Sequence, residues 1–107
     1  MKKNRDFAVS SGNVFADIGL PKPGEALAKA ELAQRIIVIL RERHLTQARA
    51  AEILGVDQPK ISALSSGQLS GFSIERLMRF LMLLGQDVQI IVKSRPRSRT
   101  QSRLLVA

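Results

Sequence analysis

Residues 46–67, which read TQARAAEILGVDQPKISALSSG, decide the fold of this 107-residue chain. Thr46 can cap a short helix, because its hydroxyl oxygen can accept a hydrogen bond from a free backbone N–H of the first turn. The helix is expected to end at Gly55, because glycine readily takes the left-handed conformation that closes helices. Asp57 can cap a second helix. Pro59 in its first turn does not destabilise this helix, because the N–H groups of the first turn have no acceptor inside the helix. Two short helices joined by a turn that contains glycine predict a helix-turn-helix unit.

Small and apolar side chains supply the core of this unit. Ala50 and Ala51 allow the second helix to cross the first closely, and Gly67 ends the second helix. The core that the two helices share is expected from Ile53, Val56, Ile61 and Leu64.

Two further helices flank the unit. Residues 25–43 place apolar side chains at Leu32, Ala33, Ile36, Ile37 and Leu40, the spacing of an amphipathic helix with Arg41 and Arg43 in its last turn. His44 follows, and without a second His or a Cys it is assigned to the helix end or the surface. Ser73 caps an apolar helix over residues 74–84. The buried stripe of that helix is expected from Leu77, Phe80, Leu81 and Leu84, and its remaining apolar side chains indicate a second contact surface.

Residues 86–93 change to the period of a strand, with Val88, Ile90 and Val92 alternating with other residues. A strand needs a partner for its backbone N–H and C=O groups. That partner is either the segment 14–18 or the same strand of a second chain. We favour the second chain, because a two-fold pair would place two helix-turn-helix units symmetrically, as palindromic DNA requires.

Length and composition allow one small domain and exclude several classes of protein. The chain has no Cys, Trp or Tyr and one His, so we expect no disulfide, no metal site, no cofactor and no catalytic residues. Its longest apolar runs have five residues, too few for a membrane span, and charges break up any signal peptide. We therefore expect a small helical binding protein, not an enzyme.

The net charge of +8 is concentrated at one end of the chain. Residues 93–107 carry five Lys and Arg and no acid, whereas residues 44–67 and 68–92 are each neutral. Such a tail is either a solvated disordered segment or an arm that grips DNA phosphates. Charge therefore bears on affinity and salt dependence, and specific recognition rests on the helix-turn-helix unit.

We divide the chain into three parts: an N-terminal arm (1–24), a helix-turn-helix domain with a C-terminal strand (25–93) and a basic flexible tail (94–107). The arm carries Phe15, Ile18 and Leu20. These side chains are too apolar for a simple tail, so the arm is expected to dock either on the chain's own helices or on a partner.

The stretch 46–67 resembles the helix-turn-helix of the Xre (Cro/CI-repressor) family. The resemblance rests on the Thr-Gln start, on Ala51 and Gly55, on the pair Ile61 and Ser62, and on Gly67. Over residues 12–95 the chain is similar to the HigA-type antitoxins. This likeness implies a mainly all-α, four- to five-helix lambda-repressor-like domain. Four positions depart from the family pattern: Arg49, Ala50, Ser65 and Ser66.

The resemblance also implies which residues contact DNA. The helix over residues 58–66 would enter the major groove, where Gln58 can pair with adenine, Lys60 with guanine or a phosphate, and Ala63 with a thymine methyl. Gln47 would hold a phosphate together with a backbone N–H. The full set of DNA-binding positions is Thr46, Gln47, Arg49, Gln58, Pro59, Lys60, Ser62, Ala63 and Ser66.

Two functions remain open. The first is a repressor that acts as the antitoxin of a HigBA-type pair, represses its own operon and neutralises a HigB- or RelE-like ribonuclease toxin. The second is a stand-alone Xre-type regulator without a toxin. Both imply a homodimer on a palindromic double-stranded operator, at the nucleoid in the cytoplasm, and no membrane.

Overall fold

The computed structural model describes residues 23–107. This part of the chain contains four helices: α3 (Pro23–Glu42), α4 (Gln47–Leu54), α5 (Gln58–Ser65) and α6 (Ile74–Leu83). The expected helical fold is confirmed, with helix bounds close to those that the sequence predicts. The apolar arm that we expect to dock, with Phe15, Ile18 and Leu20, lies outside the described residues.

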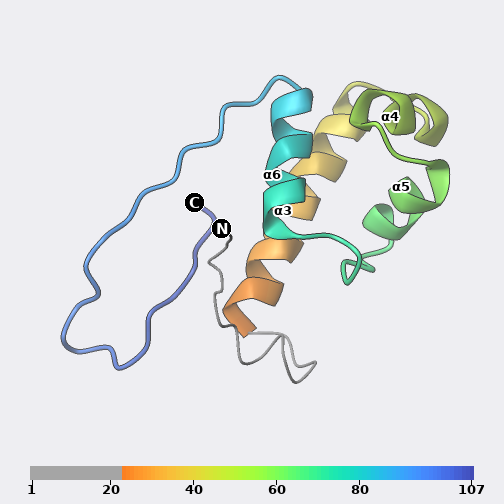
Figure 1. Ribbon diagram of the computed structural model, residues 1–107. Coiled ribbons are helices and arrows are strands. Elements are labelled where there is room, and N and C mark those ends of the chain that lie inside the picture. Colours follow the sequence, from red (N-terminus) through yellow and green to blue (C-terminus); the bar gives the residue numbers. More distant parts are fainter. Residues whose placement is uncertain (1–22) are drawn as a thin grey trace, which may run out of the picture.

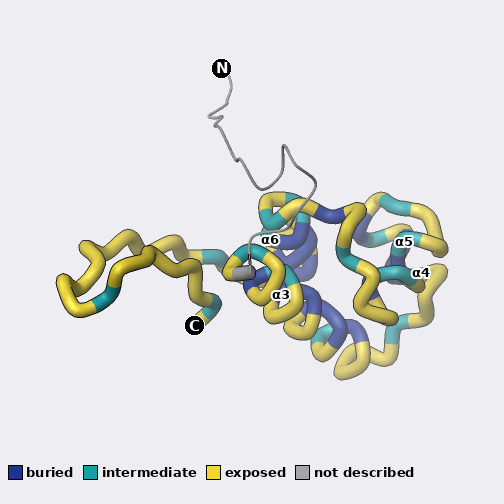
Figure 2. The backbone as a smooth tube through the Cα atoms, turned by 90° about the horizontal axis from the view of Figure 1, so that it is seen from below, coloured by how far each residue is buried: buried dark blue, intermediate teal, exposed yellow. Residues whose placement is uncertain are grey.

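The helices form two groups around one core. The longest helix, α3, lies beside α6 in the middle of the molecule, and α4 and α5 pack on one side of this pair (Figure 1). The chain that follows α6 runs out on the opposite side, in both views of the molecule (Figures 1 and 2). The buried residues lie on the inner faces of the helices (Figure 2).

The core joins all four helices. Its largest fully buried side chains are Ile36 of α3, Ile61 and Leu64 of α5, Leu77 of α6, and Leu84 directly after it. The contribution of α4 is smaller and comes from Ala50, Ala51 and Leu54. Burying one Leu or Ile stabilises the fold by roughly 1.5–3 kcal/mol. The helices therefore pack with the apolar faces that the amphipathic pattern predicts turned toward the core. Of the core that we expected for the helix-turn-helix unit, Ile53 and Val56 are only partly buried.

Side-chain caps set where three helices begin. Thr46, Asp57 and Ser73 each accept a hydrogen bond from the backbone N–H three residues later, at 3.1, 3.2 and 3.0 Å. Each cap satisfies an N–H that has no partner inside the helix and contributes about 1 kcal/mol. These local bonds explain why the predicted starts of α4, α5 and α6 are correct.

Left-handed residues set where α3 and α4 end. Gly55 has a φ of 71°, and the next N–H, that of Val56, donates to the Ala51 carbonyl at 3.0 Å. His44 plays the same part after α3 with a φ of 54°, and the Leu45 N–H donates to the Leu40 carbonyl at 3.0 Å. Histidine is among the few residues other than glycine that adopt this conformation with some frequency. The helix-end role assigned to His44 is therefore confirmed.

The single chain forms no strand over residues 86–93, where the sequence predicts one. The Gln86 N–H donates to the Leu81 carbonyl as the closing bond of α6, and the described chain shows no ladder beyond it. The side chains of Ile90 and Val92 are 74% and 90% exposed. Alternating apolar residues suit a strand, but in the single chain these backbone groups meet no second strand. The dimer pairing assigned to Val88, Ile90 and Val92 stays a prediction.

The C-terminal segment turns back toward α3. The Arg99 N–H donates to the Pro96 carbonyl at 3.1 Å and closes a turn. Farther on, Val106 packs against the core, and the Arg35 side chain donates a hydrogen bond to the Ala107 carbonyl. The segment thus contacts the domain at its far end. None of the helices α3 to α6 of the described chain combines the length and the apolar composition that a membrane span requires.

Candidate nucleic-acid interface

The outer face of α5 is a polar, solvent-exposed surface. Gln58, Pro59 and Ser62 are exposed, whereas Ile61 and Leu64 on the opposite face are each only 2% exposed. Because the buried pair anchors the helix in the core, the outer face is held rigidly. Its side chains are short or uncharged, so a flat partner such as a groove of DNA can approach closely.

Two positions predicted to contact DNA, Ala63 on α5 and Ser66 at its C-cap, are less available to a partner than the sequence suggests. Ala63 is partly buried and packs against the core, which reduces the area that it can offer to a thymine methyl. Ser66 is exposed at the end of the helix, and its hydroxyl donates to the Ala63 carbonyl at 3.2 Å. The outward positions are therefore Gln58 and Pro59 in the first turn of the helix and Ser62 one turn farther on.

Lys60 is only partly exposed, because its side chain lies against the loop before α6. It is half-buried, and its Nζ lies 5.3 Å from the centroid of the Phe72 ring. Arg76 of α6 lies over the same ring, with its Cζ 5.8 Å from the centroid. Sequence spacing alone does not bring these three residues together. Phe72 and Arg76 are consequently part of the interface region that sequence reasoning missed.

The start of α4 presents a second polar surface. Thr46 and Gln47 are exposed beside backbone N–H groups that point out of the helix end. Arg49 is exposed as well, but its Nη1 lies 2.9 Å from the Glu52 carboxylate. An exposed ion pair of this kind stabilises little, so Arg49 can exchange this partner for a phosphate at small cost.

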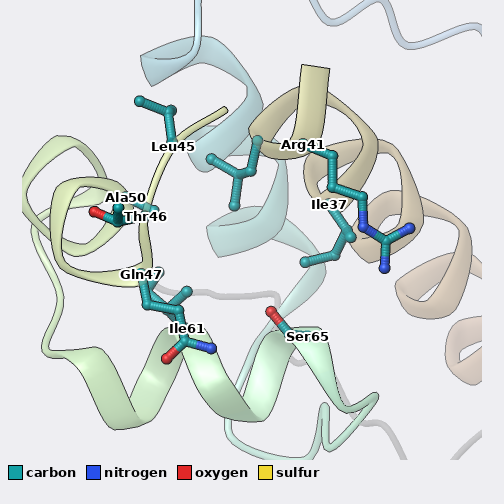
Figure 3. A pocket seen from close by; sticks show the side chains of 9 residues that line it. Ile37, Arg41, Leu45, Thr46, Gln47, Ala50, Ile61 and Ser65 are labelled. Carbon is teal, nitrogen blue, oxygen red and sulfur yellow. The ribbon is translucent and has the colours of Figure 1, made fainter. Parts of the chain in front are cut away.

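A small pocket of about 120 Å³ joins α3, α4 and α5 (Figure 3). Ile37, Ala50 and Ile61 contribute apolar atoms to its lining. Its polar groups come from three different helices and from the α4 cap, and they are Arg41, Thr46, Gln47 and Ser65.

Arg41 is the residue of this pocket that sequence reasoning assigned only to the end of α3. Its guanidinium lies at the edge of the same pocket as Gln47, the predicted phosphate-holding residue (Figure 3). The signal in the sequence is a cation in the last turn of the helix before the unit, which by itself also suits the helix dipole. The structure thus adds a cation to a surface whose predicted members are mostly neutral.

The basic tail lies away from this surface. In Figures 1 and 2 the extended chain after α6 lies across α3 and α6 from the α4–α5 pair. The five cations of residues 93–107 are therefore not next to the outer face of α5. The proposed contacts between the tail and DNA phosphates stay a prediction, as do the base contacts.

This arrangement of two capped helices with an exposed, polar second helix defines a helix-turn-helix domain. A family model described as a helix-turn-helix domain matches residues 14–93. The chain is also similar to a solved structure named as an XRE family transcriptional regulator. The two share 44% sequence identity with a TM-score of 0.75 over 81% of this chain and 98% of that one. No curated protein matches the chain.

The chain belongs to the helix-turn-helix family, and within it to the XRE type. The family match spans most of the chain and includes α3 to α6. The resemblance that residues 46–67 indicate is therefore confirmed at the level of the XRE type.

Proposed function

We propose that this protein is a transcriptional repressor that binds a palindromic operator as a homodimer. It would act at the nucleoid in the cytoplasm, as a binding protein and not as an enzyme. The observation that carries the proposal is the outer face of α5, where Gln58, Pro59 and Ser62 are exposed on a helix that Ile61 and Leu64 hold in the core. Membership of the XRE type supports the same function.

In this proposal the residues divide into two roles. Gln58 forms a bidentate pair with adenine, and Lys60 contacts guanine or a phosphate, so both contribute to recognition in the major groove. Gln47, Arg49 and Arg41 contact the phosphate backbone at the start of α4 and position the protein without reading sequence. A dimer then places its two copies of α5 about 34 Å apart, one turn of the double helix.

The test is a mobility-shift assay on the DNA upstream of the gene, with single variants on α5. Gln58→Ala should weaken specific binding by about 1–3 kcal/mol, and Lys60→Ala should weaken binding and lower the salt slope by about 0.9 if Lys60 contacts a phosphate. Gln34→Ala is the matched control, because Gln34 is exposed and lies outside the α4–α5 surface. Unchanged specific binding in both α5 variants would refute the recognition surface.

We further propose that the repressor is an antitoxin. It would regulate its own operon and neutralise a HigB- or RelE-like ribonuclease. The similarity of the sequence to HigA-type antitoxins supports this role. Exposed apolar side chains support it as well, because Met82 and Leu83 on α6 are 58% and 51% exposed and offer a surface for a protein partner.

The alternative is a stand-alone XRE-type regulator of a phage or stress operon. The solved structure that the chain resembles is named as a transcriptional regulator, which fits this alternative. Co-expression with the product of the adjacent gene separates the two functions. Co-purification, together with rescue of growth, supports the antitoxin. Separate elution of the two proteins from a size-exclusion column supports the stand-alone regulator.

A further inference from the structure

Lys60 is held at both ends of its length. Its backbone N–H donates to the Asp57 carboxylate at 3.2 Å as part of the cap of α5. At the other end its ammonium lies 5.3 Å from the centroid of the Phe72 ring, within the range of a cation–π contact. A lysine on the first turn of an exposed helix is normally free to sample many rotamers, so this contact restricts it.

The ring that receives the ammonium is itself fixed. Phe72 is 3% exposed and meets Phe80 edge to face, with the ring centroids 6.1 Å apart and the planes at 75°. The guanidinium of Arg76 lies over both rings, at 5.8 and 5.6 Å from their centroids. Because the two cations share one ring and repel each other, Arg76 limits how far the Lys60 ammonium can move toward α6.

Gly71 leaves the space that the Lys60 ammonium occupies. A Cβ at residue 71 would lie 3.1 Å from the Lys60 Nζ, so any side chain there would displace the ammonium by a few tenths of an ångström. The φ of Gly71 is not in the left-handed region, unlike those of Gly55 and Gly67, so alanine can adopt this backbone without strain. The absence of a side chain at residue 71 therefore matters for space and not for backbone conformation.

We infer that Gly71 and Phe72 act as positioning residues for Lys60, and that the seat they form determines which base edge its ammonium contacts in DNA. The inference rests on the proposed DNA-binding function and deepens it. A lysine that is already oriented loses less conformational entropy on binding and meets one acceptor, the O6/N7 edge of a guanine. A released lysine contacts phosphates at any sequence and discriminates less between bases.

The seat is tested first on the free protein by NMR. The ring current of Phe72 should shift the Lys60 ε-methylene protons upfield in the wild type, and Phe72→Leu should remove that shift. Leu40→Ala is the control, because it also removes buried apolar atoms but lies on α3, outside the contacts that hold Lys60, Phe72 and Arg76 together. Random-coil shifts for Lys60 in the wild type would overturn the seat, whether or not the protein binds DNA.

The positioning role is tested by binding to a duplex that carries the site footprinted upstream of the gene. Each guanine of one half-site is replaced in turn. The ratio of the affinity for the original duplex to the affinity for each substituted duplex measures discrimination at that guanine. Gly71→Ala and Phe72→Leu should reduce discrimination by about two- to five-fold at one guanine, the same one that Lys60→Met affects. Leu40→Ala should leave the ratio unchanged. Urea unfolding shows that each variant is folded under the assay conditions.

A double-mutant cycle separates positioning from a general loss of stability. In the Lys60→Met background, Gly71→Ala should have no further effect on discrimination, because no ammonium remains to be displaced. Additive effects, or an equal loss at every base pair, would overturn the positioning role. Failure of the wild type to prefer any upstream site would overturn the proposed function instead, and the NMR result would still decide whether the seat exists.

Discussion

Arg43 ties the end of α3 to the end of α6, and this contact yields a stability prediction. Its Nη2 donates to the Leu84 carbonyl at 2.6 Å in a partly buried position. This carbonyl belongs to the C-cap of α6, where no further turn of helix supplies a donor. A charged donor also suits the negative end of the helix dipole. Replacing Arg43 by Met keeps an unbranched side chain and removes both effects.

The expected cost of Arg43→Met follows from the hydrogen bonds around Leu84. A hydrogen bond to a charged group contributes about 1.5–3 kcal/mol when it is shielded from water. The Gln86 side chain also donates to this carbonyl, at 3.3 Å, so the carbonyl keeps one weak partner. We therefore expect the lower end of the range, a loss of about 1.5 kcal/mol. In a domain of this size that corresponds to a fall in Tm of roughly 6–12 °C.

Urea unfolding followed by circular dichroism measures this loss. Arg41→Met is the matched control, because Arg41 is an exposed arginine of the same helix end for which the structure shows no hydrogen bond to Leu84. The control should lose a few tenths of a kcal/mol at most. Adding Gln86→Ala to Arg43→Met should lower the free energy of unfolding further. Equal stability of the Arg43 and Arg41 variants would refute the assignment of Arg43 as a cap of α6.

Three further predictions concern α4, α5 and the tail. Asp57→Ala removes the cap of α5 and should lower the free energy of unfolding by about 1 kcal/mol, whereas Asp87→Ala on the exposed chain after α6 should change it little; equal urea midpoints would contradict the role of the cap. Gly55→Ala places a β-carbon at a φ of 71° and should cost about 1–2 kcal/mol in the same assay, and an unchanged midpoint would count against this account of the turn. Replacing four tail arginines by Gln would lower the salt slope of DNA binding by about 3.6 if all four met phosphates. Because the tail lies across α3 and α6 from α5, we expect a change below about 1, and a drop near the full value would show that the tail reaches the DNA.

The strand predicted over residues 86–93 is not formed in the single chain. The alternation of Val88, Ile90 and Val92 matches the period of a strand, but the period says nothing of which segment supplies the hydrogen-bond partners. In the structure Ile90 and Val92 are exposed, and the described chain has no strand opposite them. Strand formation depends on contacts between distant segments or chains, and a sequence pattern does not determine these contacts.

One part of the candidate interface could be predicted from the sequence and another part could not. The exposed face of α5 was predictable, because Ile61 and Leu64 mark the buried face and the remaining positions follow from helical geometry. The contacts of Lys60 and Arg41 were not predictable. Lys60 meets a ring in the loop before α6, and Arg41 lines the same pocket as Gln47 at the start of α4.

The sequence by itself determined the helices and their order. The bonds that cap α4, α5 and α6 span three residues, and the turn after α4 depends on one glycine, so both kinds of signal are local. Only the tertiary structure decided where the long side chains lie. Arg43 finds its acceptor 41 residues away at Leu84, and Lys60 is held by Phe72, because long side chains have many rotamers and packing selects one.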